Sequence, residues 1–351
     1  MTVIANMAVV AVALAVLALL PSPGADERTR PVKPSAVSPA LPHTATAPPV
    51  TATAESAKKV GANEAGLIPV IMYHRLLPKR LASIDRTPAQ VRREMERLAK
   101  DGYVPITAAD FVSGKIDIPA GGHPVVLTFD DGNPSHFMTD DQGNPRNDTA
   151  AGIIYAIAAK YPSFRPAATF WINRRPFGLR DPARQAEAVH WLLGHGFEVG
   201  NHTYSHPDLH RLSGERVSEQ IVRQERLIKK LGVTSSTTFA LPYGSRPKKL
   251  TRAHDGSWDG TKYHFDGVFL AGAEPAISPY AKSFDRYAIP RIQSNGRQGD
   301  CRRWCTSYWL DWLDRHPRER YTSDGDPTHV SVPRKLAGKV AKGRAKAIIA
   351  Y

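Results

Sequence analysis

The sequence contains only two cysteines among its 351 residues, Cys301 and Cys305, and they lie four positions apart. No second Cys or His pair accompanies them, which argues against a cysteine-based metal site. If the chain is exported to an oxidising compartment, the two cysteines are expected to form a small disulfide. Free thiols are the alternative that the sequence leaves open.

Acidic residues are scarce relative to basic ones: 33 Asp and Glu stand against 47 Lys and Arg, a formal net charge of +14. Residues 286–351 carry fourteen basic and six acidic residues, and no acidic residue follows Arg334. Such a tail attracts polyanions such as anionic cell-wall polymers. The chain has no zinc-finger spacing and no RNA-binding aromatic motif, so nucleic acid is not expected as a partner. The same charge pattern is equally compatible with a solvated tail that binds no partner.

The apolar run at residues 3–20 lacks the Lys or Arg that usually precedes such a run in a signal peptide. Only Asn6 interrupts it, and small residues suited to a signal peptidase follow. Its length would also just span a bilayer. We expect residues 1–25 to be a signal peptide or a membrane anchor, in a protein that is secreted or associated with the cell envelope. A membrane is a partner only if residues 3–20 are retained.

Residues 26–66 lack any strand or helix period and are rich in Pro, Ala, Thr and Ser. This composition cannot bury a core, so we predict a flexible linker. One large folded domain is then expected at 67–300, followed by a helical, basic extension at 301–351.

Helical and strand-like stretches alternate through the predicted domain. The first helix is expected to begin with Thr87 as N-cap and Pro88 at its first position. Further helical patterns cover 151–159, 182–194 and 213–231, and apolar strand-like stretches lie at 68–74, 167–172, 237–241 and 267–271. Strands that alternate with helices predict an α/β fold with a parallel sheet.

A further apolar stretch, residues 124–129, ends in two carboxylates, Asp130 and Asp131, before Gly132 turns the chain. It is typical of a buried strand that is covered on both faces. Ligands and catalysis lie at the carboxyl end of such strands. Adjacent carboxylates repel each other unless a cation shares them or one is protonated. An ordinary strand-to-turn exit is the alternative, because Asp-Asp-Gly is also good turn chemistry.

About seventy residues further on, His202 and His206 follow a short strand over 198–200. Two imidazoles and one carboxylate suit zinc or a similar divalent ion and leave a position open for water. We assign the ion to Asp131, His202 and His206. Asp130 points elsewhere because side chains alternate on an extended chain, so it is assigned as the general base.

These residues carry a resemblance. Thr128 to Gly132, followed by His202, Thr203 and His206, resembles the motifs of the polysaccharide deacetylase family with its NodB homology domain. The resemblance extends over about residues 68–292. It implies a distorted (β/α) barrel of seven strands, a metal ion that is expected to be Zn²⁺, and the same roles for the two aspartates.

The family's third motif is similar to residues 239–244 of this chain, which include Pro242 and Tyr243. The resemblance implies that the backbone N–H of Tyr243 faces the oxyanion of the reaction. Many family members carry an arginine, paired with the base, where this chain has Ala240. We assign that missing charge to Arg291, which lies in a short strand-like stretch; a surface arginine is the alternative.

The general acid is not identifiable from the sequence. Leu313 and His316 match the Leu-x-x-His spacing of the family's last motif, but they lie in a helical pattern, so we interpret the match as accidental. His74 follows the first strand and is a candidate for the rim of the site. A histidine that merely hydrogen-bonds a loop is the alternative.

The resulting hypothesis is an exported, metal-dependent hydrolase that removes acetyl groups from a polysaccharide. N-acetyl groups are favoured over O-acetyl groups, and peptidoglycan, chitin-like oligomers or an exopolysaccharide would all fit. An inactive cell-wall-binding protein on the same scaffold is the alternative that Ala240 and the missing last motif suggest. A glycosidase that uses Asp130 with another carboxylate, and no metal, is a third.

Overall fold

The computed structural model describes residues 51–234, 236–296, 302–341, 343 and 347–351. The elements of its central α/β part are β2 (Val70–Tyr73), α3 (Pro88–Lys100), β3 (Tyr103–Ile106), α4 (Ala108–Ser113), β4 (His123–Asp131), α5 (Ala150–Lys160), β5 (Thr169–Ile172), α6 (Pro182–Gly194), β6 (Glu198–Asn201), α7 (Gly214–Lys230), β7 (Thr238–Ala240), β10 (Gly267–Phe269), β12 (Ile292–Gln293) and α8 (Thr306–Arg315). The remaining elements are α2 (Ala54–Val60), β1 (Leu67–Ile68), the hairpin of β8 (Asp255–Trp258) and β9 (Thr261–His264), β11 (Ala276–Ile277), β13 (Val330–Val332) and β14 (Ile348–Ala350).

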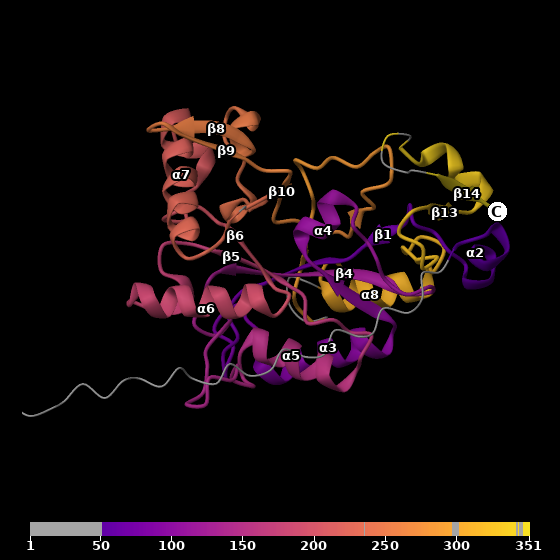
Figure 1. Ribbon diagram of the computed structural model, residues 1–351, viewed down its shortest axis with the longest axis horizontal. Coiled ribbons are helices and arrows are strands. Elements are labelled where there is room, and N and C mark those ends of the chain that lie inside the picture. The colour runs from indigo at the N-terminus through magenta and orange to yellow at the C-terminus, as the bar shows by residue number, and fades with distance from the viewer. Residues whose placement is uncertain (1–50, 235, 297–301, 342, 344–346) are drawn as a thin grey trace, which may run out of the picture. The chain divides into compact units, whose positions relative to one another are not determined.

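Seven parallel strands form one curled path in the order β10, β7, β6, β5, β4, β2 and β12, and β3 adds to the N-terminal half of β4. Two parallel bridges, from Phe269 to Ile289 and from Gly272 to Ile292, connect the end of β10 to the segment that contains β12. The path therefore returns on itself. The predicted α/β fold, a distorted barrel of seven strands, is confirmed (Figure 1).

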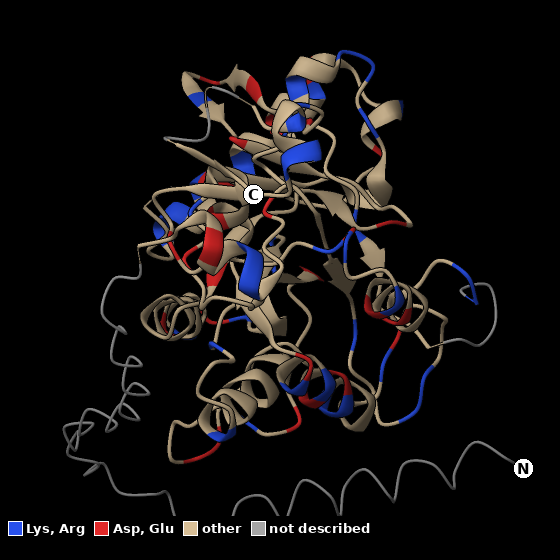
Figure 2. Cartoon of the chain, turned by 90° about the vertical axis from the view of Figure 1, so that its right-hand side faces the viewer, with Lys and Arg blue, Asp and Glu red and all other residues tan. Residues whose placement is uncertain are grey.

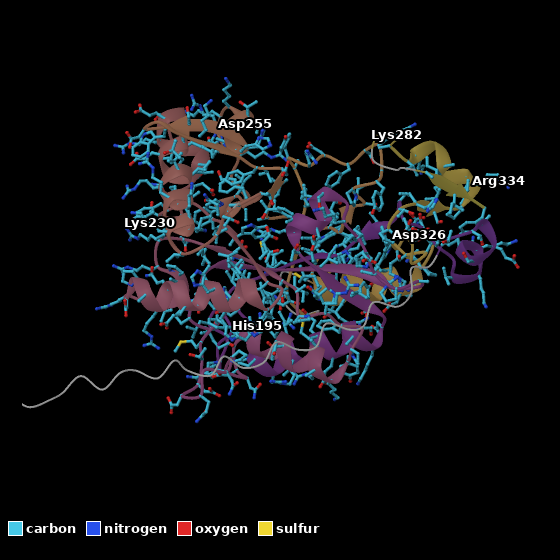
Figure 3. The ribbon with its side chains drawn as sticks, in the orientation of Figure 1. His195, Lys230, Asp255, Lys282, Asp326 and Arg334 are labelled. Carbon is cyan, nitrogen blue, oxygen red and sulfur yellow. The ribbon has the colours of Figure 1, made fainter. Side chains whose placement is uncertain are left out.

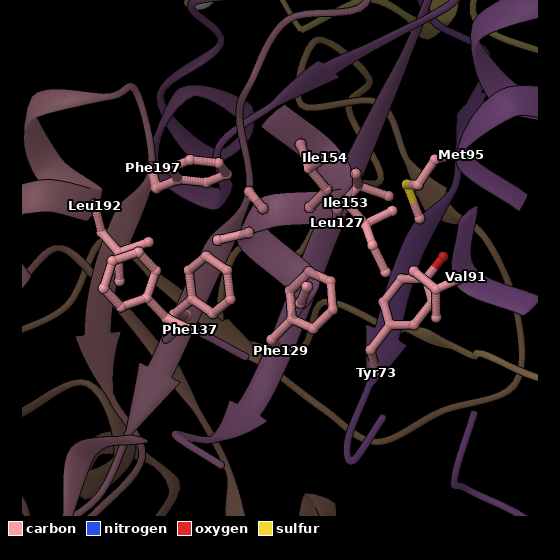
Figure 4. Packing of buried hydrophobic residues seen from close by; sticks show 14 of the residues in the cluster. Tyr73, Val91, Met95, Leu127, Phe129, Phe137, Ile153, Ile154, Leu192 and Phe197 are labelled. Carbon is pink, nitrogen blue, oxygen red and sulfur yellow. The ribbon is translucent and has the colours of Figure 1, made fainter. Parts of the chain in front are cut away.

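The central strand β4 is buried on both faces, as its apolar composition predicts. Phe129 stacks on Tyr73 of β2, with ring centroids 4.8 Å apart, and on Phe170 of β5 at 5.0 Å (Figure 4). Because side chains alternate along a strand, Thr128 and Asp130 point to the opposite face, into the barrel.

The predicted helix starts are confirmed by their caps. The Thr87 hydroxyl accepts the backbone N–H of Gln90, and the Gln90 side chain accepts the N–H of Thr87, which closes a capping box before Pro88. At the start of α7 the Ser213 hydroxyl accepts the backbone N–H of Arg216. These caps fix where each helix leaves the carboxyl edge of the sheet.

The predicted linker at 26–66 is wrong for its last part, while residues 1–50 lie outside the described residues. Residues 54–60 form α2, which Thr53 caps, and Ala57 and Ala62 are fully buried. Asn63 exchanges backbone hydrogen bonds with Thr322. The composition argument failed because small side chains and backbone groups find their partners in the C-terminal segment, far away in sequence.

The predicted helical extension at 301–351 contains α8 but also two strands, β13 and β14, which pair in parallel. Cys305 is disulfide-bonded, and its expected partner Cys301 lies outside the described residues. Lys and Arg occur on several helices and loops, with Asp and Glu between them (Figure 2). In the part of the chain that is described, no helix is long and apolar enough to cross a membrane.

Glu64 connects the segment around α2 to the C-terminal segment, which includes Asp326 (Figure 3). It is 2% exposed, and its carboxyl group accepts the backbone N–H of Ser331 at 2.8 Å and the hydroxyl of Tyr321 at 3.1 Å. Burial, reinforced by the charge of Asp324, raises the pKa of Glu64 to about 8. The carboxyl group is therefore mostly neutral at pH 7, which reduces the cost of burying it.

We expect the α2 segment to stabilise the domain. A chain that begins at residue 67 should unfold roughly 5–10 °C below one that begins at residue 51, because it loses buried alanines and paired backbone groups. Within the longer chain, Ala57→Asp should lower the melting temperature by a similar amount, whereas Lys58→Asp on the exposed face should not. Equal melting temperatures for the two truncations, measured by circular dichroism, would show that this segment contributes nothing.

Candidate metal centre and active site

The two aspartates at the end of β4 occupy different environments. Asp130 is 2% exposed and faces the barrel interior, whereas the side chain of Asp131 is 40% exposed. The backbone of Asp131 has φ 79°, in the left-handed region, at the end of the strand. Both carboxylates nevertheless lie close to His202, whose Nε2 is 3.8 Å from Oδ2 of Asp130 and 3.6 Å from Oδ1 of Asp131. Their assignment as base and ligand stays a prediction.

Asp131, His202 and His206 bring one donor atom each to within 4.8 Å of one another. The Asp131 Oδ1 atom lies 3.6 Å from Nε2 of His202 and 3.4 Å from Nε2 of His206. The Nδ1–H of His202 donates to the carbonyl of Ala240 at 2.8 Å, which leaves its Nε2 lone pair free. Burial lowers the pKa of His202 despite the two nearby carboxylates, which favours the neutral form that binds metals.

This donor set fits a divalent metal ion. One carboxylate oxygen and two imidazole nitrogens, with an imidazole oriented by a backbone carbonyl, are typical zinc ligands. Among the described residues, no other group of three such side chains converges in this way.

Left-handed backbone conformations concentrate at the site. Besides Asp131, positive φ angles occur at Thr203 (64°), His206 (56°) and Tyr243 (58°). Each costs about 1–3 kcal/mol for a residue other than glycine. These residues lie at the carboxyl ends of β4, β6 and β7. Contacts within the site, rather than the intrinsic backbone preferences of these residues, therefore determine the conformation of the loops.

Asp130 forms a buried ion pair with Arg291. Nη1 and Nη2 of the arginine donate to the two carboxylate oxygens at 2.7 and 2.8 Å, and its Nε donates to the carbonyl of Leu270 at 2.7 Å. Arg291 is fully buried, with its guanidinium over the ring of Trp171. The alternative of a surface arginine is therefore excluded. Its role in a reaction stays a prediction.

The ion pair sets the charge state of Asp130. Burial alone would raise the pKa of this carboxyl, but the charge of Arg291, assisted by His202, outweighs it and holds the pKa well below its usual range. Ala240, at the position where an arginine was expected, is fully buried and contributes its carbonyl to His202 instead.

Tyr243 lies at the rim. It belongs to the 3₁₀ turn Pro242–Gly244, its side chain is 71% exposed, and its ring centroid lies 4.5 Å from that of His206. Pro242 beneath it is buried. The predicted oxyanion role of the Tyr243 N–H stays a prediction.

His74 lies near the site, and so does a histidine that the sequence analysis missed. The backbone carbonyl of His74 accepts a hydrogen bond from the ring Nε2–H of His136 at 2.7 Å. His136 is fully buried, and burial lowers its pKa to about 4. Its place five residues after Asp131, in the loop that leaves β4, was the available signal.

His316 does not belong to a strand end. It caps the C-terminus of α8, is exposed, and stacks on Trp312 at 4.1 Å. The helical interpretation of the Leu313–His316 match agrees with this position.

Two comparisons with known sequences each match part of this chain to deacetylases. Residues 117–255 match the family model described as polysaccharide deacetylase, a shorter stretch than the 68–292 that we expected. A chitooligosaccharide deacetylase of Bradyrhizobium sp. (strain ANU 289) is 28% identical over 127 residues, which are 36% of this chain and 47% of that protein. The chain thus spans about half the length of this relative. Residues 117–255, which the family model matches, include both aspartates and both histidines of the site, whereas Arg291 lies outside them.

Solved structures of low sequence identity resemble the chain. The Streptococcus pyogenes deacetylase PplD, in complex with acetate, has a TM-score of 0.48 and 18% identity over 64% of this chain and 91% of that one. BC0361, a polysaccharide deacetylase from Bacillus cereus, has a TM-score of 0.47 and 19% identity over 64% of each chain.

The metal assignment predicts a specific loss of binding. His206→Ala should weaken Zn²⁺ binding about 100-fold or more, because it removes one of three donors. Asp130→Asn should retain the ion, and His316→Ala is the matched histidine control. Calorimetric titration of metal-free protein and metal analysis after dialysis measure this directly. Equal Zn²⁺ affinity in His206→Ala and His316→Ala would contradict the assignment.

Proposed function

The resemblance to the polysaccharide deacetylase family is confirmed, and on this basis we propose that the chain is a metal-dependent hydrolase that removes acetyl groups from a polysaccharide. The observation that carries the proposal is the pairing of a buried, ionised Asp130 with a separate Asp131–His202–His206 donor set. N-acetyl groups are the proposed target, and peptidoglycan, chitin-like oligomers or an exopolysaccharide are the proposed substrates. We also propose that the protein acts outside the cytoplasm.

The proposed reaction assigns one task to each group. A divalent ion held by Asp131, His202 and His206, with Zn²⁺ as the proposed metal, supplies Lewis acidity, which brings the pKa of water to about 7. Asp130, ionised beside Arg291, accepts the proton of the attacking water. The N–H of Tyr243 stabilises the oxyanion that develops on the acetyl group. The leaving amine then takes a proton, for which His74 is the proposed donor.

The Asp130–Arg291 pair weakens the alternative of an inactive wall-binding protein. That alternative depended partly on Ala240, which removes the arginine that many family members use. In this structure Arg291 supplies the same charge from another strand, at 2.7–2.8 Å from the carboxylate. Acetate release also distinguishes the proposal from a glycosidase, which would shorten the chain without releasing acetate.

Acetate release from an N-acetylated glycan tests the proposed function. We expect Asp130→Asn to lower the turnover about 10²–10⁴-fold while the ion stays bound, because the amide cannot accept the proton. Metal analysis of the same preparation is the control. Turnover within a few-fold of the wild type would show that Asp130 is not the base.

Arg291 should affect the pH profile of the rate. Its charge lowers the pKa of Asp130, so Arg291→Ala should raise that pKa and move the acidic limb of the kcat–pH profile to higher pH. The ion should remain bound, and kcat should fall.

Two further variants control for the loss of a buried partner. Arg291→Lys keeps a charge and should shift the limb less, and Ala240→Arg combined with Arg291→Ala should recover part of the rate. Folding of each variant is checked by circular dichroism. A folded Arg291→Ala protein with an unshifted acidic limb would refute the role.

A further inference from the structure

A second concave feature lies between α3 and the N-terminal end of α8. It encloses about 440 Å³, and four of its lining residues are arginines, against a single carboxylate, Glu94. The arginines come from two places, the loop after β2, with Arg80 and Arg86, and α3, with Arg93 and Arg97. We refer to it below as the basic pocket.

Two of the four arginines retain an uncompensated charge. Arg97 is paired with Asp101, Asp311 and Asp314 at 3.2, 2.8 and 2.9 Å, and Arg86 is paired with Glu94 at 3.0 Å. Arg80 donates to the carbonyl of Ser83 at 2.8 Å and Arg93 is exposed, and neither has a carboxylate partner among the described residues. Any unpaired positive charge at the pocket therefore comes from Arg80 and Arg93.

Unused hydrogen-bond donors lie in the same wall. Arg86 is 6% exposed, and its two terminal nitrogens donate to Ser294 and to Glu94, each at 3.0 Å. Its Nε, and the buried Nε of Arg80, have no acceptor among the described residues. Guanidinium N–H groups without an acceptor favour an oxygen anion as their partner.

The ten-residue helix α8 begins at the pocket and adds to the positive potential. Its N-cap, Cys305, makes no side-chain hydrogen bond to the first turn, and Ser307 in that turn lines the pocket. Backbone N–H groups at a helix N-terminus carry a partial positive charge. Helix and arginines thus favour the same kind of ligand.

The pocket adjoins the candidate active site. The Tyr73 hydroxyl donates to Glu94 in the pocket wall, and Tyr73 ends β2, the strand that pairs with β4. The N–H of Ser294, whose hydroxyl accepts from Arg86, donates to the carbonyl of Met72 in β2. The basic pocket therefore lies at the carboxyl ends of β2 and β12, the edge of the barrel that carries the site.

We propose that the basic pocket binds an oxyanion group, a phosphate, sulfate or carboxylate, on the glycan chain whose acetyl groups are removed at the neighbouring site. The substrate is then an anionic polysaccharide rather than a neutral one. This inference rests on the proposed function for the identity of the ligand, but the affinity of the pocket for an anion can be measured without any turnover.

Inorganic phosphate, and glucuronate as the carboxylate probe, are titrated into the full-length protein by calorimetry. Arg80→Glu combined with Arg93→Glu should weaken binding at least about tenfold, because both unpaired charges are reversed. Lys100→Glu, an exposed change of the same charge on α3, should leave the affinity within about twofold of the wild type. The probe that binds more tightly identifies the preferred anion.

Kinetics on matched glycans supply the second measurement. The ratio of kcat/KM for an anionic over a neutral N-acetylated glycan should fall about tenfold or more in the double variant and stay constant in Lys100→Glu. Phosphate and glucuronate that bind the double variant as tightly as the wild type would overturn the proposal, since the anion is then held elsewhere. If anion binding depends on the two arginines but no glycan releases acetate, the pocket stands and the proposed function fails.

Discussion

The ion pair between Asp130 and Arg291 is buried inside the barrel, where the two residues are 2% and 0% exposed. Removing one partner of such a pair lowers the free energy of unfolding by about 3–5 kcal/mol, because the other charge is left buried without a partner. Arg291 also donates to the carbonyl of Leu270, so one guanidinium connects β4, the end of β10 and the segment before β12. The same contacts that close the barrel therefore hold a carboxylate ionised at its carboxyl edge.

In the proposed site, two adjacent carboxylates have different roles: Asp131 binds the metal ion and Asp130 accepts a proton. Alternation along β4 places Asp130 in the interior, and the left-handed backbone of Asp131 places the second carboxylate against His202 and His206. A carboxylate that binds an ion and a carboxylate that accepts a proton need different surroundings. Here one residue step along a strand is sufficient to provide them.

The two edges of the barrel serve different purposes. The candidate site and the basic pocket share the carboxyl edge, where loops carry charged and strained residues. Elsewhere, the segment around α2 pairs with the C-terminal segment through Asn63, Thr322 and the buried carboxyl of Glu64. This second region contributes packing and backbone hydrogen bonds.

Local patterns in the sequence were sufficient for the α/β fold and the helix cap at Thr87, because periodicity and capping act over a few residues. The grouping of Asp131, His202 and His206 was predicted from their ligand chemistry at two strand ends and from the family resemblance. The ordered segment after residue 50, the buried His136 and the basic pocket were decided only by the tertiary structure. Each depends on partners that are distant in sequence, as when Glu64 meets Ser331. The sequence could offer Arg291 as a candidate, but only barrel closure brings its guanidinium to Asp130, since that contact spans 161 positions of the chain.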